Sequence, residues 1–112
     1  NSNDVLPFIF YHCSRWWMKD TEIDLVAYSD TAVMFCEMKW QDDVNPVKIY
    51  ADLVRKSELF LSSHQGYTER YYLIVAKSFT RKKPGINDSV LTWDSKTLLT
   101  MHRKVKTGRK KG

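Results

Sequence analysis

The sequence predicts a domain of the α/β or α+β class, with a mixed sheet flanked by helices, from three observations. Five segments have the alternating or continuous apolar pattern of strands. Two others place apolar residues at helical spacing and begin at good helix N-caps. Hydrophobic residues make up 43% of the 112 residues, which suffices for one packed core and argues against a disordered chain.

The first part of the chain predicts three strands. Residues 5–12 are apolar and aromatic with one proline, which favours an edge strand. Residues 22–29 alternate between two faces, and residues 32–40 form the next strand. Only Asp30 and Thr31 separate these two strands, so an antiparallel hairpin is the simplest arrangement. Both faces of the hairpin are largely apolar, which predicts a sheet that is covered on both sides.

A helix and a central strand follow. Asn45 suits an N-cap and Pro46 suits the first helical position, and the apolar spacing continues through Ser63. Gly66 closes the helical region. Residues 70–77 form a continuous apolar run, which is typical of a strand buried on both faces.

The last part of the chain predicts a loop, a short strand and a helix. Residues 78–89 form a basic loop, and residues 90–93 form the short strand. Asp94 suits the N-cap of a helix over about residues 95–104. The predicted order is therefore β-β-β-α-β-β-α.

Charge and length predict one domain over residues 1–105 and a flexible basic tail over residues 106–112. The net charge of +5 favours an anionic partner, with nucleic acid first. No apolar run reaches membrane-spanning length and no secretory signal is present, so we expect a cytoplasmic protein without membrane contact. Cys13 and Cys36 are then expected to be free and reduced. The chain lacks the spacing of a zinc site and the glycine-rich phosphate-binding loop of ATPases.

The predicted hairpin brings charged residues to one patch. Asp24 lies opposite Glu37, and Glu22 lies opposite Lys39. Two opposed carboxylates repel each other unless a cation lies between them. Hard divalent cations prefer oxygen ligands. We therefore predict a Mg²⁺ or Mn²⁺ site between Asp24 and Glu37, with the carbonyl of Met38 as a further ligand.

Such a site predicts hydrolysis of phosphodiester bonds. The ion would polarise a phosphodiester and lower the pKa of a bound water. Lys39 would stabilise charge that develops on the phosphate or orient the attacking water. Glu22 would pair with Lys39 or join the metal ligands. The alternative interpretation is a surface patch of cross-strand ion pairs without a function.

These residues form the signature of the PD-(D/E)xK nuclease superfamily, here Glu22-Ile23-Asp24 and then Glu37-Met38-Lys39. Arg15-Trp16-Trp17 and the Trp40 that follows Lys39 extend the pattern, which resembles the C-terminal domain of an archaeal AAA-type ATPase family. The resemblance covers roughly residues 10–80. It implies a restriction-endonuclease-like core with a mixed sheet of four to five strands, a divalent-metal nuclease site for DNA, and an N-terminal ATPase domain in the parent protein.

The chain departs from that superfamily at its beginning. Members usually have a helix before the first strand, often with another acidic residue, whereas this chain starts at Asn1 with strand material. We therefore expect a C-terminal fragment of a longer protein. Intact Asp24, Glu37 and Lys39 favour an enzyme, and the missing acidic helix favours an inactive DNA-binding or regulatory module attached to the ATPase. A scaffolding domain that forms a homodimer is a third alternative, because aromatic residues are many.

Other residues are candidates for substrate contact. Lys56 interrupts the apolar stripe of its helix, so it points into the site or extends past the core edge to water. Arg15 and Trp40 are candidates for binding nucleic acid, the second by stacking on a base. Arg81, Lys82 and Lys83 would contact phosphates if their loop lies beside the site, and otherwise form a solvated basic turn.

Overall fold

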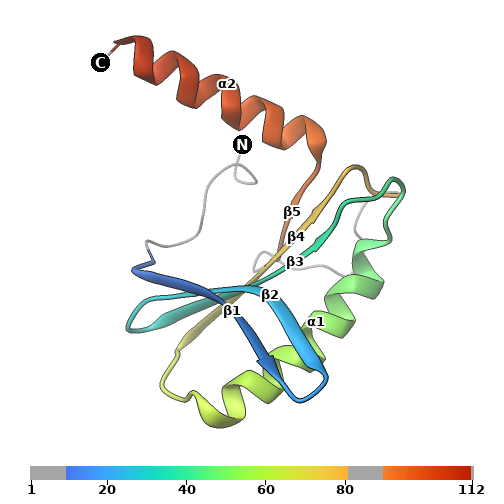
Figure 1. Ribbon diagram of the computed structural model, residues 1–112, viewed down its shortest axis with the longest axis vertical. Helices are drawn as coiled ribbons and strands as arrows, with labels where there is room; N and C mark the ends of the chain where they lie inside the picture. The colour runs from blue at the N-terminus through green and yellow to red at the C-terminus, as the bar shows by residue number, and fades with distance from the viewer. Residues whose placement is uncertain (1–9, 81–89, 112) are drawn as a thin grey trace.

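The computed structural model describes residues 10–80 and 90–111, with side chains up to Arg103, and has a five-stranded mixed sheet with two helices (Figure 1). The elements in chain order are β1 (His12–Met18), β2 (Thr21–Tyr28), β3 (Ala32–Lys39), α1 (Pro46–Ser63), β4 (Glu69–Ala76), β5 (Val90–Trp93) and α2 (Ser95–Lys111). The strands lie in the sheet in sequence order. Pairing is antiparallel from β1 to β3 and parallel from β3 to β5. The predicted fold class is therefore confirmed.

Most predicted elements are present within one residue of their expected bounds, but the first strand is wrong. It was expected over residues 5–12, whereas the first strand of the sheet is β1, and residues 1–9 lie outside the described part of the chain. The reason is that β1 is an edge strand with mostly exposed side chains, so its sequence lacks the apolar pattern. The last helix is longer than expected and continues to Lys111, because Lys and Arg are good helix formers.

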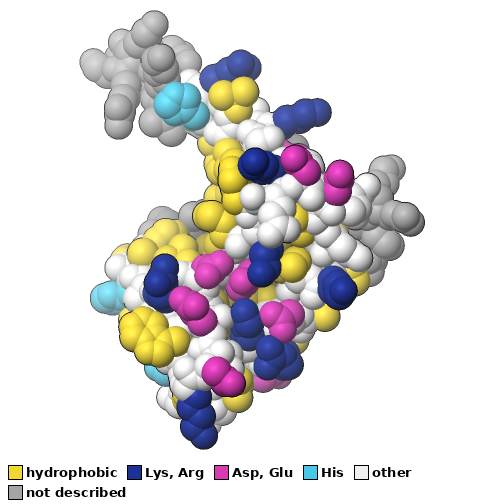
Figure 2. All heavy atoms as spheres, turned by 45° about the vertical axis from the view of Figure 1, so that its right-hand side comes forward, with side chains coloured by type: hydrophobic (Ala, Val, Ile, Leu, Met, Phe, Trp, Pro, Cys, Tyr) yellow, Lys and Arg dark blue, Asp and Glu magenta, His cyan; other side chains and the backbone are white. Residues whose placement is uncertain are grey.

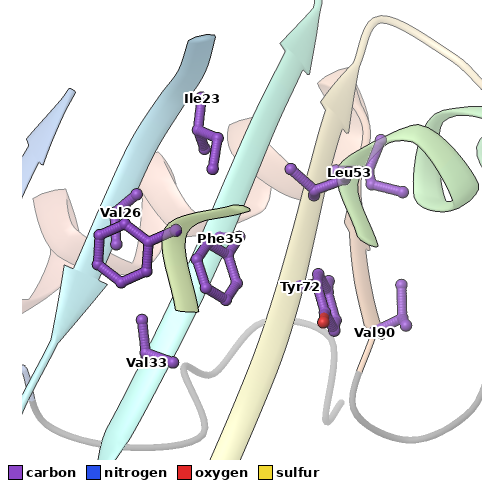
Figure 3. Close-up of a cluster of buried hydrophobic side chains, with 9 residues drawn as sticks. Ile23, Val26, Val33, Phe35, Leu53, Tyr72 and Val90 are labelled. Atoms are coloured by element: carbon purple, nitrogen blue, oxygen red, sulfur yellow. The ribbon is translucent and has the colours of Figure 1, made fainter. Parts of the chain in front are cut away.

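One core lies between the sheet and α1, which crosses β2, β3 and β4. Figure 3 shows seven of its side chains meeting on one side of the sheet: Ile23, Val26, Val33, Phe35, Leu53, Tyr72 and Val90. The opposite face buries a second cluster, which includes Met34, Cys36 and Leu73, and Leu98 of α2 packs against it. Both faces thus bury apolar side chains, as predicted. Beyond its contact with β5, α2 extends away from the sheet (Figure 1).

Helix α1 begins where the sequence predicts. The side chain of Asn45 accepts a hydrogen bond from Val47 N at 3.1 Å, and Pro46 occupies the first turn. In the middle of the helix the fully buried Ser57 hydroxyl hydrogen-bonds to the hydroxyl of Tyr72 on β4 at 3.1 Å. Gly66, just beyond the helix, has φ +106°, a conformation that favours glycine. The cap and the Ser57–Tyr72 hydrogen bond hold α1 against the sheet.

We predict that Leu53→Ala lowers the free energy of unfolding by about 2–5 kcal/mol, because it leaves a cavity beneath α1. Leu53 is 1% exposed, whereas Leu59 on the same helix is 38% exposed. Leu59→Ala makes the same chemical change outside the core, and we expect an effect within about 0.5 kcal/mol. Urea denaturation of both variants measures the difference. Equal losses would contradict the placement of α1.

Candidate metal site

A β-bulge shapes the strand that carries Asp24. The pairing of β1 with β2 changes register between two cross-strand pairs, Ser14–Val26 and Trp16–Ile23. Between these pairs β2 has two residues, Asp24 and Leu25, where β1 has only Arg15. The extra residue reverses the alternation of side chains, so that Ile23 and Val26 both point into the core under α1. Asp24 therefore lies at an irregular position of the strand.

Asp24 also lies at the point where the pairing of β2 with β3 ends. The described pairs of these strands run from Tyr28–Val33 to Leu25–Cys36, in the register that the two-residue turn predicts. Two residues beyond Cys36, Met38 N donates a hydrogen bond to Asp24 Oδ2 at 2.9 Å. The N–H and C=O of one residue in an antiparallel strand point to the same neighbouring strand. The carbonyl of Met38 thus faces the same side as Asp24.

Glu37 carries a buried carboxylate in this region. The residue is 8% exposed, and its Oε1 accepts no hydrogen bond from the described residues. Burial, followed by the negative charge of Asp24, raises the Glu37 pKa above its usual value, while the charges of Lys56 and Lys39 act in the opposite direction. Asp24 and Glu37 are therefore close enough to repel each other, as the sequence predicts.

Lys56 points toward Glu37 and does not extend to water. Its Nζ lies 3.5 Å from Glu37 Oε1 and 3.5 Å from Asp52 Oδ2, and its side chain is 16% exposed. Asp52 was not among the residues predicted from the sequence. Its position four residues before Lys56 on a helix was the signal that could have found it. Arg55 also binds Asp52, with Nη2 2.8 Å from Oδ1.

Lys39 is exposed and lies two residues beyond Glu37 on β3, so the two side chains share a face of the strand. Trp40 follows it and is 49% exposed. Figure 2 shows acidic and basic side chains intermixed on the face turned forward, instead of one basic patch. The net charge alone therefore does not mark a binding surface on this face.

Glu22 was expected on the same patch as Lys39, but the structure places its side chain with Arg15 of β1. The Glu22 carboxylate lies 3.4 Å from Arg15 Nε. The bulge is the reason, because Ile23 points toward α1 and the neighbouring Glu22 therefore points to the other face. Arg15 is exposed but engaged with Glu22, on that same other face.

Two further predictions concern residues away from the carboxylates. Cys36 is buried on the face opposite α1, as expected, and burial raises the pKa of its thiol to about 12. It is therefore a small hydrophobic residue and no nucleophile at neutral pH. The basic segment with Arg81, Lys82 and Lys83 lies outside the described residues.

The donor set fits a hard divalent cation. Within the described residues, no three side chains of the types His, Cys, Asp and Glu cluster to hold a metal. The site offers two carboxylates, Asp24 and Glu37, and the carbonyl of Met38. Mg²⁺ is usually bound by one or two carboxylates together with water and substrate phosphate, so these donors suit it better than zinc.

A comparison with known proteins assigns the chain to a family. The model of DUF234, described as archaeal and bacterial proteins of unknown function, matches residues 1–57, just over half of the chain. The chain belongs to this family. The segment that matches DUF234 ends within α1 and contains all the residues of the site: Asp24, Glu37, Met38, Lys39, Asp52 and Lys56.

The chain is 43% identical over 89 residues to an uncharacterized protein of Methanocaldococcus jannaschii. The aligned region covers 76% of this chain and 20% of the relative, so the DUF234 chain spans about a fifth of the length of that relative. No solved structure matches the chain. None of the described helices is long and apolar enough to span a membrane.

We predict that the Glu37 pKa in metal-free solution is higher than its usual value, because burial and the charge of Asp24 disfavour the carboxylate. Its protonated form favours the folded state, so this contribution to stability is fully present below the usual pKa and is lost as the pH rises through the raised pKa. Asp24→Asn should lower the Glu37 pKa and Lys56→Met should raise it further, since the two variants remove charges of opposite sign. A carboxyl-carbon NMR titration in EDTA measures all three values. Shifts of the same sign in both variants would contradict this electrostatic account.

Proposed function

We propose that this domain hydrolyses phosphodiester bonds in DNA with Mg²⁺ or Mn²⁺, as a nuclease of the PD-(D/E)xK type. One observation carries the proposal: the buried Glu37 has an oxygen without a hydrogen bond from the described residues, next to a second carboxylate and on the same face as an exposed lysine. Burying a charge next to a like charge is costly, and perturbed carboxylates of this kind cluster at functional sites.

Each residue of the site has a separate proposed role. Asp24, Glu37 and the Met38 carbonyl would hold the ion, which, when bound, polarises the phosphodiester and makes water a better nucleophile at neutral pH. Lys39 is exposed and therefore within reach of a substrate, where its ammonium group stabilises negative charge on the phosphate. Trp40 borders Lys39 and offers an exposed indole for stacking on a base.

We also propose that the domain is part of a larger protein. The relative is about five times longer than the matched region, which supports a domain within a larger protein. The resemblance to the C-terminal domain of archaeal ATPases suggests an N-terminal ATPase domain as the covalent partner, in the cytoplasm. The net charge of +5 supports attraction to nucleic acid.

A second candidate function is a DNA-binding or regulatory module without catalysis. The observation that favours it is the ion pair of Lys56 with Glu37, which already compensates part of the buried charge. The described residues also supply two carboxylates to the site and no cluster of three possible metal ligands. This module would bind DNA through its basic residues and leave it intact.

We predict cleavage of labelled DNA in Mn²⁺ that disappears in EDTA and falls by about 10²–10³-fold in Lys39→Ala, because the lysine stabilises charge in the transition state. Single-stranded, duplex and branched substrates should be compared. Lys96→Ala removes an exposed lysine from α2 and should leave the rate unchanged.

Two controls separate the candidates. Asp24→Asn should abolish cleavage, whereas Glu22→Gln removes a nearby carboxylate on the other face and should retain it. Cleavage that survives both Lys39→Ala and Asp24→Asn would reject this site. Salt-sensitive DNA binding without any cleavage would establish the module instead.

A further inference from the structure

Lys56 lies between two carboxylates with different surroundings. Its Nζ is 3.5 Å from Oε1 of Glu37 on β3 and 3.5 Å from Oδ2 of Asp52, one turn earlier on α1. The side chain of Glu37 is 11% exposed and that of Asp52 is 48% exposed. One ammonium group therefore has a buried partner and a partner at the surface.

The contact of Lys56 with Glu37 compensates the carboxylate charge at a long distance. A separation of 3.5 Å is long for a charge-assisted hydrogen bond, and Glu37 Oε1 accepts none within the described part of the chain. A divalent ion on Glu37 would bring two further positive charges next to the ammonium group. Like charges at this distance repel strongly in a poorly solvated site, so the ion and Lys56 compete for the same carboxylate.

Asp52 is suited to receive the displaced lysine. It is four residues before Lys56 on α1, so the two side chains are neighbours on one face of the helix. The hydrogen bond from Arg55 at 2.8 Å, followed by the charge of Lys56, holds the pKa of Asp52 below its usual value, so this carboxylate stays ionised. Lys56 Nζ already lies 3.5 Å from Asp52 Oδ2, so an ammonium group that leaves Glu37 keeps this partner.

We propose that Lys56 is a resident counter-cation of Glu37 that a divalent ion displaces onto Asp52. This inference rests on the proposed metal site and adds a residue that lowers the affinity of that site for the ion. Lys56 keeps the buried carboxylate paired while the site holds no ion, and it weakens ion binding by the free energy of its own contact with Glu37. Asp52 reduces that penalty because it offers the lysine a second partner. Lys56 is thus a positioning residue that sets metal affinity.

Isothermal titration with Mn²⁺ tests the displacement. Lys56→Met should bind Mn²⁺ at least about fivefold more tightly than the wild type, and Asp52→Asn should bind it more weakly. Lys96→Met makes the same change of charge on α2 and should bind as the wild type does. In the Lys56→Met background, Asp52→Asn should have almost no further effect, because no lysine remains to be received.

Thermal unfolding gives a second readout that does not depend on activity. In EDTA, Lys56→Met should unfold at a lower temperature than the wild type, because Glu37 loses its counter-charge. Saturating Mn²⁺ should raise its melting temperature by more than that of the wild type. A role of Lys56 in packing alone would lower both temperatures and leave the metal-induced shift unchanged.

The outcomes distinguish this inference from the proposed function. Binding of Mn²⁺ by the wild type with equal or weaker binding by Lys56→Met, or additive effects of the two substitutions, would overturn the counter-cation and leave the metal site standing. Absence of binding in both proteins would overturn both. Tighter binding by Lys56→Met, together with the loss of the Asp52 effect in its background, would support the displacement.

Discussion

The hydrogen bond from Met38 N to Asp24 Oδ2 is the contact on which the site depends. It lies where β2 stops pairing with β3. The carboxylate of Asp24 accepts the hydrogen bond of Met38 N in place of a backbone carbonyl of β2. The bulge of β2 makes this possible, because it turns the strand at the residue that must leave the ladder. Asp24 is consequently fixed beside Glu37 by the backbone of the neighbouring strand, without a further side chain.

Helix α1 supplies the second half of the arrangement. Its apolar face packs on β2, β3 and β4, and the same packing carries Lys56 to the buried Glu37. The cost of burying Glu37 shows in its raised pKa, which Lys56 lowers without restoring the usual value. A core made only for stability would gain from an apolar residue at this position, since buried ion pairs seldom stabilise a fold more than well-packed hydrophobic residues. This cost is the physical reason to regard the patch as functional.

Much of this arrangement follows from the sequence. The two-residue turn at Asp30 and Thr31 fixes the register of β2 with β3, which is why the approach of Asp24 to Glu37 could be predicted. The cap at Asn45 likewise fixes the start of α1. The misplacement of Glu22 has one cause, because alternation assumes a regular strand and a bulge moves every residue beyond it to the other face. The contact of Lys56 with Glu37 depends on how α1 is rotated against the sheet, which helical spacing alone does not determine. Edge strand β1 was missed because its exposed side chains carry no apolar pattern.

The claim that Asp24 and Glu37 form a divalent-ion site is tested most directly by anomalous diffraction from crystals soaked in Mn²⁺. We predict an anomalous peak beside both carboxylates and the Met38 carbonyl, with the ammonium group of Lys56 turned toward Asp52. Crystals of Asp24→Asn treated in the same way should lack the peak. A map without density at this position, in which Lys56 still contacts Glu37 at saturating Mn²⁺, would contradict the account and leave the patch as a set of ion pairs.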